Sequence, residues 1–300
     1  MIYTVTFNPA LDYAMNVQAL EDGIVNRSDS EYLSFGGKGI NVSGILLELD
    51  RLSVALGFIA GFTGIALNNA LTEKNICTDF VTLPKGLTRI NIKIKSDAET
   101  DINACGPSID EVSLEKLYKK INKLTDGDIL ILSGSVPSFL NDDAYAKILE
   151  QLKKKKILCV VDATKKLLLN TLPFKPFLIK PNRQELAELF DKTTLSDDEI
   201  ENCAKSLQLL GARNVLVSLA DDGAFLLDEN GVAHTCATVK GEVVNSVGAG
   251  DAMVAGFMSA WLDKKDYDYA LRLGTACGAA TAFSKTLAKK DEIFAILEKI

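Results

Sequence analysis

From about residue 126, short apolar runs alternate with amphipathic stretches, and this alternation restricts the fold more than any other feature of the 300-residue chain. The runs that predict buried strands are Asp128–Leu132, Ile157–Val161, Phe177–Ile179 and Asn214–Leu219. The stretches with helical spacing are Asp142–Lys155, Arg183–Phe190 and Asp197–Leu210. Alternating strands and helices indicate βαβ units, and hence an α/β fold with a mostly parallel sheet covered by helices on both faces. Such a sheet binds ligands at the carboxyl ends of its strands.

The N-terminal third has a different pattern. Ile2–Phe7 predicts a strand and Lys38–Leu49 a helix, but residues 10–35 between them show no helical period. Thr88–Lys95 alternates isoleucine with polar residues, as in a strand with one face exposed to water. We therefore expect residues of about 10–35 and 87–106 to form a small β-sheet lid on a single domain that spans residues 1–300.

Charge and composition exclude several classes of protein. Thirty-three basic and 40 acidic residues give a net charge of −7, whereas nucleic-acid binders usually carry a basic surface. His234 is the only histidine, and the six cysteines form no C-x-x-C pair, so a zinc site is not expected. The N-terminus lacks the charged start of a signal peptide, and glycines interrupt the longest apolar stretch, 52–67. We expect a cytoplasmic protein with no nucleic-acid or membrane partner.

The motif with the clearest chemistry is Gly248-Ala249-Gly250-Asp251, which precedes an amphipathic helix at 252–262. A turn of small residues that opens a helix leaves backbone N–H groups unpaired, and these groups can bind an anion. Asp251 in the first helical turn would face the same place. A carboxylate there suits a step in which a hydroxyl loses its proton while it attacks a phosphoryl group. The alternative is an ordinary glycine turn followed by an aspartate that favours a helix N-terminus.

Three further motifs carry polar groups at predicted element ends. Gly36-Gly37-Lys38-Gly39-Ile40-Asn41 precedes a helix, allows close backbone approach to a ligand and offers a cation, but it lacks the Walker spacing. Asn182 and Glu185 follow the strand 177–179 and could either hold a hydrated Mg²⁺ or form a capping box. Asp12 follows the first strand, where it could bind sugar hydroxyls or simply occupy a turn.

Together these motifs resemble those of the ribokinase-like, PfkB-type sugar kinases. The resemblance is collinear and covers essentially the whole chain, with further matches at Ser133–Pro137, Ser218–Ala224 and Val244–Asp251. Within the family, it is most specific to the bacterial kinases of fructose 1-phosphate, on the segments Phe35–Ser43, Thr88–Asn91 and Ala276–Ser284. Tagatose-6-phosphate kinases are near relatives.

The resemblance implies a role for each matching residue. Asp251 corresponds to the catalytic base, and Gly248, Ala249 and Gly250 correspond to the anion hole for the transferred phosphoryl group. The implied sugar-binding residues are Asp12, Gly37, Lys38 and Asn41. Arg89 would hold the phosphate already on the substrate, with Ser135 and Arg27 as further candidates. The implied nucleotide-binding residues are Lys180, Asn182, Ser218, Asp221, Gly223, Cys277 and Thr281. Glu185 and Asn182 would hold Mg²⁺ through water.

The implied activity is transfer of a phosphoryl group from ATP, with Mg²⁺, to the C6 hydroxyl of fructose 1-phosphate. Alternative acceptors are tagatose 6-phosphate and fructose 6-phosphate, and a more distant alternative is a non-catalytic sugar-phosphate sensor. A dinucleotide-dependent oxidoreductase is not favoured, because no G-x-G-x-x-G follows the first strand. The apolar alternation in the lid also predicts a homodimer that forms through the lid.

Overall fold

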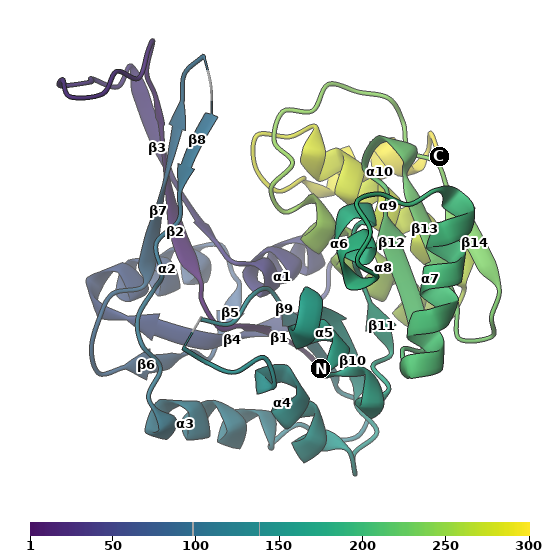
Figure 1. Ribbon diagram of the computed structural model, residues 1–300. Coiled ribbons are helices and arrows are strands. Elements are labelled where there is room, and N and C mark those ends of the chain that lie inside the picture. Colours follow the sequence, from purple (N-terminus) through teal and green to yellow (C-terminus); the bar gives the residue numbers. More distant parts are fainter. Residues whose placement is uncertain (98, 138) are drawn as a thin grey trace.

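A mostly parallel sheet forms the centre of the protein in the computed structural model, which describes residues 1–97, 99–137 and 139–300 (Figure 1). The strand order is β14-β13-β12-β11-β10-β9-β1-β4-β5, and β6 also pairs with β4. Strands β1 to β12 of this sheet pair in parallel, whereas β13 and β14 form an antiparallel edge. The strands are β1 (Ile2–Thr6), β4 (Ser53–Ala60), β5 (Cys77–Thr78), β6 (Val81–Leu83), β9 (Ile129–Ser133), β10 (Leu158–Asp162), β11 (Leu178–Ile179), β12 (Asn214–Ser218), β13 (Ala224–Leu227) and β14 (Ala233–Cys236).

Helices cover both faces of this sheet, as the alternating pattern predicts. The first face packs against α1 (Lys38–Glu48), α2 (Gly61–Glu73), α8 (Ala249–Lys264), α9 (Tyr267–Ala282) and α10 (Lys290–Leu297). The second packs against α3 (Glu111–Ile121), α4 (Ala144–Leu152), α5 (Lys165–Leu169), α6 (Arg183–Leu189) and α7 (Asp197–Leu210). Two 3₁₀ turns lie at Leu172–Phe174 and Ala220–Asp222. Each face has its own apolar core, because successive side chains of a buried strand point to opposite faces.

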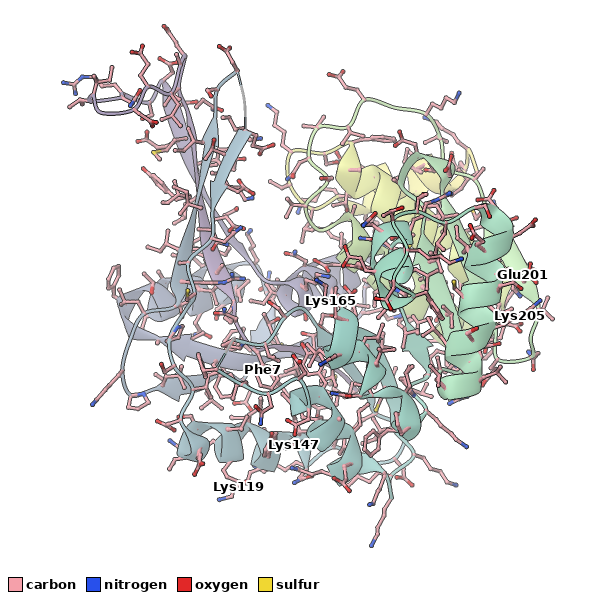
Figure 2. All side chains as sticks on the ribbon, in the orientation of Figure 1. Phe7, Lys119, Lys147, Lys165, Glu201 and Lys205 are labelled. Atoms are coloured by element: carbon pink, nitrogen blue, oxygen red, sulfur yellow. The ribbon has the colours of Figure 1, made fainter. Side chains whose placement is uncertain are left out.

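A separate four-stranded sheet lies in the segments expected to form the lid, and we keep the name lid for this sheet. Its order is β3-β2-β7-β8, with bounds β2 (Ala10–Asn16), β3 (Ser30–Gly36), β7 (Arg89–Lys95) and β8 (Glu99–Ile102). It projects away from the main sheet at the left of Figure 1. Figure 2 shows its side chains standing out on both sides, whereas those around Phe7 pack densely between the main sheet and its helices. The predicted α/β fold with a small second sheet is therefore confirmed.

Several expected elements differ from the observed ones only at their ends. The predicted helix at 142–155 is the shorter α4, and the predicted helix at 252–262 is α8, which already begins at Ala249. Among the residues that the structure describes, no helix is both long enough and apolar enough to cross a membrane.

Candidate active site

The carboxyl ends of five parallel strands meet at one edge of the main sheet, and several of the predicted site residues follow four of these ends. β1, β9, β10, β11 and β12 run in the same direction in adjacent positions. β1 leads into the lid strand that carries Asp12, and β9 leads into Ser135. Lys180 follows β11, and Ser218 ends β12. The topology thus collects residues that lie far apart in the sequence.

Asp251 lies in the first turn of α8 and is 4% exposed. The helix begins after Gly248, whose φ of 86° is a left-handed conformation that favours glycine. The Asn41 side-chain amide donates a 2.8 Å hydrogen bond to Oδ2 of Asp251. A Cβ atom on Gly250 would lie 3.1 Å from Nζ of Lys180, so the ammonium group and the glycine turn line the same small space. The glycine turn at the start of α8 thus has a cation directly beside it, an arrangement suited to an anion.

The structure adds a buried carboxylate, Asp162, that the sequence analysis did not identify. It ends β10 and is 1% exposed. Its Oδ2 atom lies 3.3 Å from Nζ of Lys38, and its Oδ1 atom lies 3.4 Å from Nζ of Lys180. Asp162 follows the predicted strand 157–161 just as Lys180 follows the strand 177–179. The position of an acidic residue at the carboxyl end of a buried strand was therefore the signal that could have revealed it.

The pKa values of the two buried aspartates are shifted in opposite directions. Burial raises the pKa of Asp251 to about 7, and the nearby Asp162 carboxylate acts in the same direction, against Lys38, Asn41 and Lys180. Burial alone would also raise the pKa of Asp162, but Lys180 and Lys38 outweigh it and keep the pKa below its usual value. Asp162 thus holds the two cations, while Asp251 is poised to exchange a proton near neutral pH.

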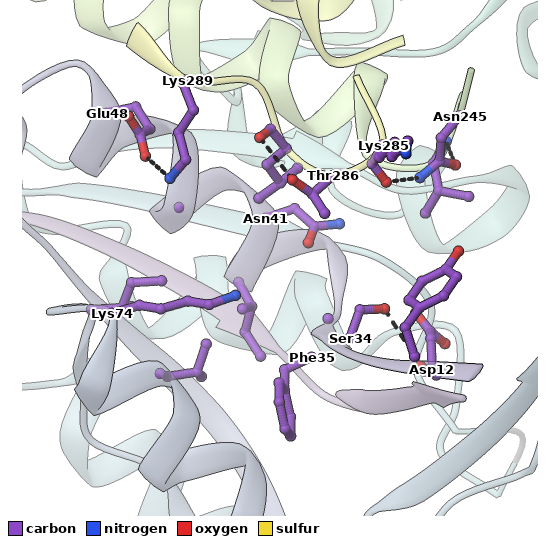
Figure 3. Close-up of a pocket in the computed structure, with 18 of the residues that line it drawn as sticks. Asp12, Ser34, Phe35, Asn41, Glu48, Lys74, Asn245, Lys285, Thr286 and Lys289 are labelled. Carbon is purple, nitrogen blue, oxygen red and sulfur yellow. Dashed lines mark hydrogen bonds and ion pairs between the residues drawn. The ribbon is translucent and has the colours of Figure 1, made fainter. Parts of the chain in front are cut away.

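Asp12, on lid strand β2, is a further carboxylate and lines a cavity of about 330 Å³ that Asn41 also lines. Figure 3 shows Asn41 between the lid strands that carry Asp12 and Ser34 and the two loops that carry Asn245 and Lys285–Thr286. A Cβ atom on Gly36 would lie 3.5 Å from Oδ2 of Asp12 and 3.8 Å from Oδ1 of Asn41. The predicted sugar residues Asp12 and Asn41 are therefore brought together around the glycine pair.

Gly37 and Lys38 are brought to the same place by a tight turn before α1. Gly37 has a φ of 135°, and a Cβ atom there would lie 2.7 Å from Cγ2 of Thr6. Only glycine fits this turn, which sets Lys38 at the start of α1 and directs its ammonium group to Asp162. Asp162 and Asp251 raise the pKa of Lys38, although burial acts against them as the largest single effect, so the side chain stays a cation.

Of the three candidates for binding the existing phosphate, only Arg89 has an anchored side chain among the described residues. It begins β7, and its Nε atom donates to the Asn8 carbonyl at 3.1 Å. Burial lowers the pKa of Arg89, and Asp12 opposes this effect. Ser135 is exposed in the turn after β9, beside Gly134, which faces the Lys38 side chain. Arg27 lies in the loop between β2 and β3, and Figure 1 shows this loop at the end of the lid farthest from the main sheet.

Asn182 and Glu185 form the capping box of α6. Oδ1 of Asn182 accepts the Glu185 N–H at 2.7 Å, and Oε2 of Glu185 accepts the Asn182 N–H at 2.9 Å. The capping box, which the sequence analysis gave as the alternative to Mg²⁺ binding by this pair, is therefore present. The second carboxylate oxygen of Glu185 is not part of the box, and Glu185 lies near enough to raise the pKa of Lys38. A role toward a hydrated cation is compatible with the cap.

The predicted nucleotide residues fall into two groups. Ser218 ends β12 and is half-buried, and Asp221 is exposed in the following 3₁₀ turn. Gly223 closes this turn with a φ of 91°, and a Cβ atom there would lie 2.0 Å from the Cys236 carbonyl oxygen. By contrast, Cys277 and Thr281 are fully buried in α9. The side chain of Cys277 faces Gly256 of α8, so these two side chains contribute to the core behind the site.

Among residues 1–97, 99–137 and 139–300, no group of three or more His, Cys, Asp or Glu side chains could hold a metal ion. Mg²⁺ commonly keeps several waters and binds through one or two carboxylates together with substrate phosphates. Asp162, Asp251 and Glu185 all lie near enough to Lys38 to raise its pKa. Oδ1 of Asp162 is buried and has no hydrogen-bond partner besides its ion pair with Lys180, so an oxygen ligand remains available there.

The sequence was compared with known proteins, and curated relatives match over nearly their full length. The chain is 42% identical to a 1-phosphofructokinase of Bacillus subtilis, covering 100% of this chain and 98% of the relative. It is 41% identical to a D-tagatose-1-phosphate kinase of Bacillus licheniformis, covering 96% and 94%. The predicted resemblance to bacterial kinases of fructose 1-phosphate is confirmed at the level of sequence.

Solved structures show the same fold. A putative phosphofructokinase from Staphylococcus aureus has a TM-score of 0.88 at 41% identity and covers 99% of this chain and 97% of its own. A ribokinase from Arabidopsis thaliana, at 18% identity, shares the fold with a TM-score of 0.82 over 99% and 98%. The sequence pattern of the pfkB family carbohydrate kinases matches residues 5–292. With the whole site contained in that span, the chain belongs to the pfkB family of carbohydrate kinases.

Proposed function

We propose that the protein transfers the γ-phosphoryl group of ATP to the C6 hydroxyl of fructose 1-phosphate, giving fructose 1,6-bisphosphate and ADP. The observation that carries this proposal is the position of Asp251. Its carboxylate is buried beside a glycine turn that can bind a phosphoryl group, and Asn41 fixes its orientation at 2.8 Å. The raised pKa of Asp251, about 7, matches the demand on a general base at neutral pH.

In this proposal each charged group has one task. Asp251 accepts the proton of the attacking hydroxyl, while the backbone N–H groups at Gly248–Gly250 and the Lys180 ammonium stabilise charge on the transferred group. Asp162 holds Lys38 and Lys180 at 3.3 and 3.4 Å, so both cations are in place before substrates bind. Asp12 binds sugar hydroxyls, and Arg89 binds the phosphate at the other end of the sugar. Closure of the lid would exclude water and thereby limit ATP hydrolysis.

A non-catalytic sensor would not need this arrangement. A sensor gains nothing from a buried carboxylate next to an anion-binding turn, because the carboxylate repels the anion that the turn attracts and its burial is costly. A catalyst needs this arrangement, since the carboxylate becomes neutral as the proton transfers. The burial of Asp251 therefore supports the enzyme over the sensor.

We propose Mg²⁺ as the metal, held through water by Glu185 and Asn182; when bound, it would neutralise charge on the nucleotide phosphates. Glu185→Gln should raise the Mg²⁺ concentration for half-maximal rate several-fold, because a neutral amide binds the hydrated cation less well. A glutamine can still complete a capping box, so the melting temperature should change little. The control is Glu185→Ala, which also removes the cap and should lower the melting temperature. An unchanged Mg²⁺ requirement in Glu185→Gln would limit Glu185 to its structural role.

Ketohexose 1-phosphates are the favoured acceptors, because the relatives at 42% and 41% identity are named for the 1-phosphates of fructose and tagatose. These two sugars differ only in configuration at C4. The proposal is tested by measuring kcat/KM for fructose 1-phosphate, tagatose 1-phosphate, tagatose 6-phosphate and fructose 6-phosphate in a coupled ADP assay. We expect the highest value for fructose 1-phosphate. A higher value for any other acceptor reassigns the substrate, and no ADP with any of them refutes the kinase proposal.

We also propose that two copies of the chain associate through the lid. Leu33, Tyr13, Ile92 and Ile102 form one row across its four strands, and Leu33 and Ile102 are 44% and 56% exposed. An exposed apolar row on a small sheet is typical of a protein interface. We expect a dimer by light scattering, and Ile102→Lys should convert it to monomers. A monomeric parent protein at micromolar concentration would contradict the interface.

A further inference from the structure

Asn91 contacts both the sugar side and the phosphate side of the site, although it matches none of the implied binding positions. It lies on β7, directly beside Asp12 in the parallel pairing of β2 with β7, and is 6% exposed. Its Nδ2 atom donates a 2.7 Å hydrogen bond to Oδ1 of Asp12. Its Oδ1 atom accepts the backbone N–H of Ala104 at 3.2 Å. One end of this buried amide is thus occupied by a carboxylate that lines the cavity, and the other end by the backbone of a residue that also contacts Arg89.

These two bonds fix which way Asp12 points. The Ala104 N–H can only donate, so it determines that the Asn91 oxygen faces Ala104 and that the NH₂ group faces Asp12. With Oδ1 of Asp12 held by this NH₂ group, Oδ2 is left beside Gly36, which lines the same cavity. Asp12 therefore presents one oxygen to the cavity in one orientation, which is what specific binding of a sugar hydroxyl requires.

The same residue anchors the segment beside Arg89. The carbonyl of Ala104 accepts a bond from Nη1 of Arg89 at 3.5 Å, and the carbonyl of Cys105 accepts one from Nδ2 of Asn8 at 2.8 Å. Arg89 in turn donates through Nε to the Asn8 carbonyl at 3.1 Å. Segment 104–105, Asn8 and Arg89 therefore form a closed set of bonds, and Asn91 attaches this set to Asp12.

From this geometry we infer that Asn91 is a positioning residue that sets Asp12 for the sugar hydroxyls and links its position to that of the phosphate-binding Arg89. The inference rests on the proposed function, since it assigns Asp12 and Arg89 to opposite ends of a phosphorylated sugar. It predicts that Asn91 affects binding of the phosphorylated acceptor and not of ATP, although its side chain need not touch either substrate.

The first test is Asn91→Ala, assayed with whichever ketohexose phosphate the wild-type protein uses best. We expect the KM for that acceptor to rise at least about 10-fold and the KM for ATP to change less than about twofold. Because part of the effect of Asn91 passes through Asp12, Asp12→Ala combined with Asn91→Ala should lose less than the two single losses combined. The matched control is Asn16→Ala, which removes another cross-strand asparagine bond of the lid, to Ser30 at 2.7 Å. It should leave both KM values unchanged.

The second test separates positioning from simple support of the lid. Asn91→Asp keeps the shape but places a carboxyl group against Asp12, and two such groups share a proton at low pH. The shared proton restores the donor, so the acceptor KM of this variant should approach the wild-type value at mildly acidic pH and rise steeply at mildly alkaline pH. Asn91→Ala should show no such additional pH dependence.

Two results would overturn the inference: an acceptor KM for Asn91→Ala within twofold of wild type, or identical pH profiles for Asn91→Ala and Asn91→Asp. Neither depends on which ketohexose phosphate is preferred. If the wild-type protein phosphorylates none of them, the proposed function fails first, and that result is visible before any variant is compared.

Discussion

Asp251→Asn should lower kcat by about 10²- to 10⁴-fold, the range for loss of a general base. Asparagine keeps the shape of the side chain and can still bond to Asn41, but it cannot accept the proton of the sugar hydroxyl. The KM values for sugar phosphate and ATP should change only a few-fold, because Gly248–Gly250, Lys180 and Arg89 remain in place. Steady-state kinetics of the purified variant tests this, and near-wild-type turnover would remove Asp251 from the mechanism.

The pH dependence gives an independent check on the same residue. Because the pKa of Asp251 is raised to about 7, kcat/KM of the wild-type protein should fall as the pH drops below 7, and not only below about 4 as for an ordinary aspartate. The Asp251→Asn variant should lose this acid limb from whatever activity remains.

The stability of the folded protein should depend on pH in the opposite direction to its activity. A carboxyl group whose pKa is higher in the folded than in the unfolded protein favours folding when protonated, so its contribution is present below about pH 4 and is lost as the pH rises through about 7. Asp251→Asn should therefore melt at a higher temperature than wild type at mildly alkaline pH, with a smaller difference at mildly acidic pH. This comparison also shows that the variant is folded.

Arg89→Ala should lower kcat/KM for fructose 1-phosphate by about 30- to 1000-fold, which is about 2–4 kcal/mol. Most of the loss should appear in the KM for the sugar phosphate. The guanidinium is partly buried and is held at the base of the lid by the Asn8 carbonyl, so a phosphate there loses its partner in a poorly solvated place. Arg89→Lys should recover only part of the loss, because an ammonium group cannot reproduce the planar fork.

An unphosphorylated acceptor separates phosphate recognition from support of the lid. Free fructose has no phosphate for Arg89 to bind, so its low kcat/KM should be nearly the same in Arg89→Ala and in wild type. If the variant loses activity toward fructose and fructose 1-phosphate alike, or raises the KM for ATP equally, Arg89 is a structural residue at the base of the lid.

The main sheet and its helices could be predicted from the sequence because the spacing of apolar residues there matches the burial of the same residues in the fold. Strands such as β9 and β10 are buried on both faces and therefore read as continuous apolar runs. The same agreement located Asp251, since the glycine turn and the helix start are adjacent in the sequence. It also located the lid strand Arg89–Lys95, whose alternation reflects one polar and one apolar face.

The site residues and contacts that the sequence did not predict depend on contacts between distant parts of the chain. The strand pattern could have pointed to Asp162, but its ion pair with Lys38, 124 positions away, appears only in the folded structure. The role inferred for Asn91 depends on its hydrogen bonds to Asp12, 79 positions earlier, and to Ala104 in a loop without regular structure. For Glu185, both interpretations could be stated from the spacing, but only the structure shows that the capping box forms. Cys277 and Thr281 matched by position, yet the packing of α9 against α8 buries their side chains.

The central claim is that a phosphoryl group passes from ATP to C6 of fructose 1-phosphate with Asp251 as the base. The most direct measurement is ³¹P NMR of ATP and fructose 1-phosphate incubated with the wild-type protein and Mg²⁺, with Asp251→Asn in parallel. The account predicts equal amounts of ADP and fructose 1,6-bisphosphate with wild type, and almost none with the variant over the same time. ADP that accumulates with inorganic phosphate, or a new phosphate on any other carbon of the sugar, would contradict it.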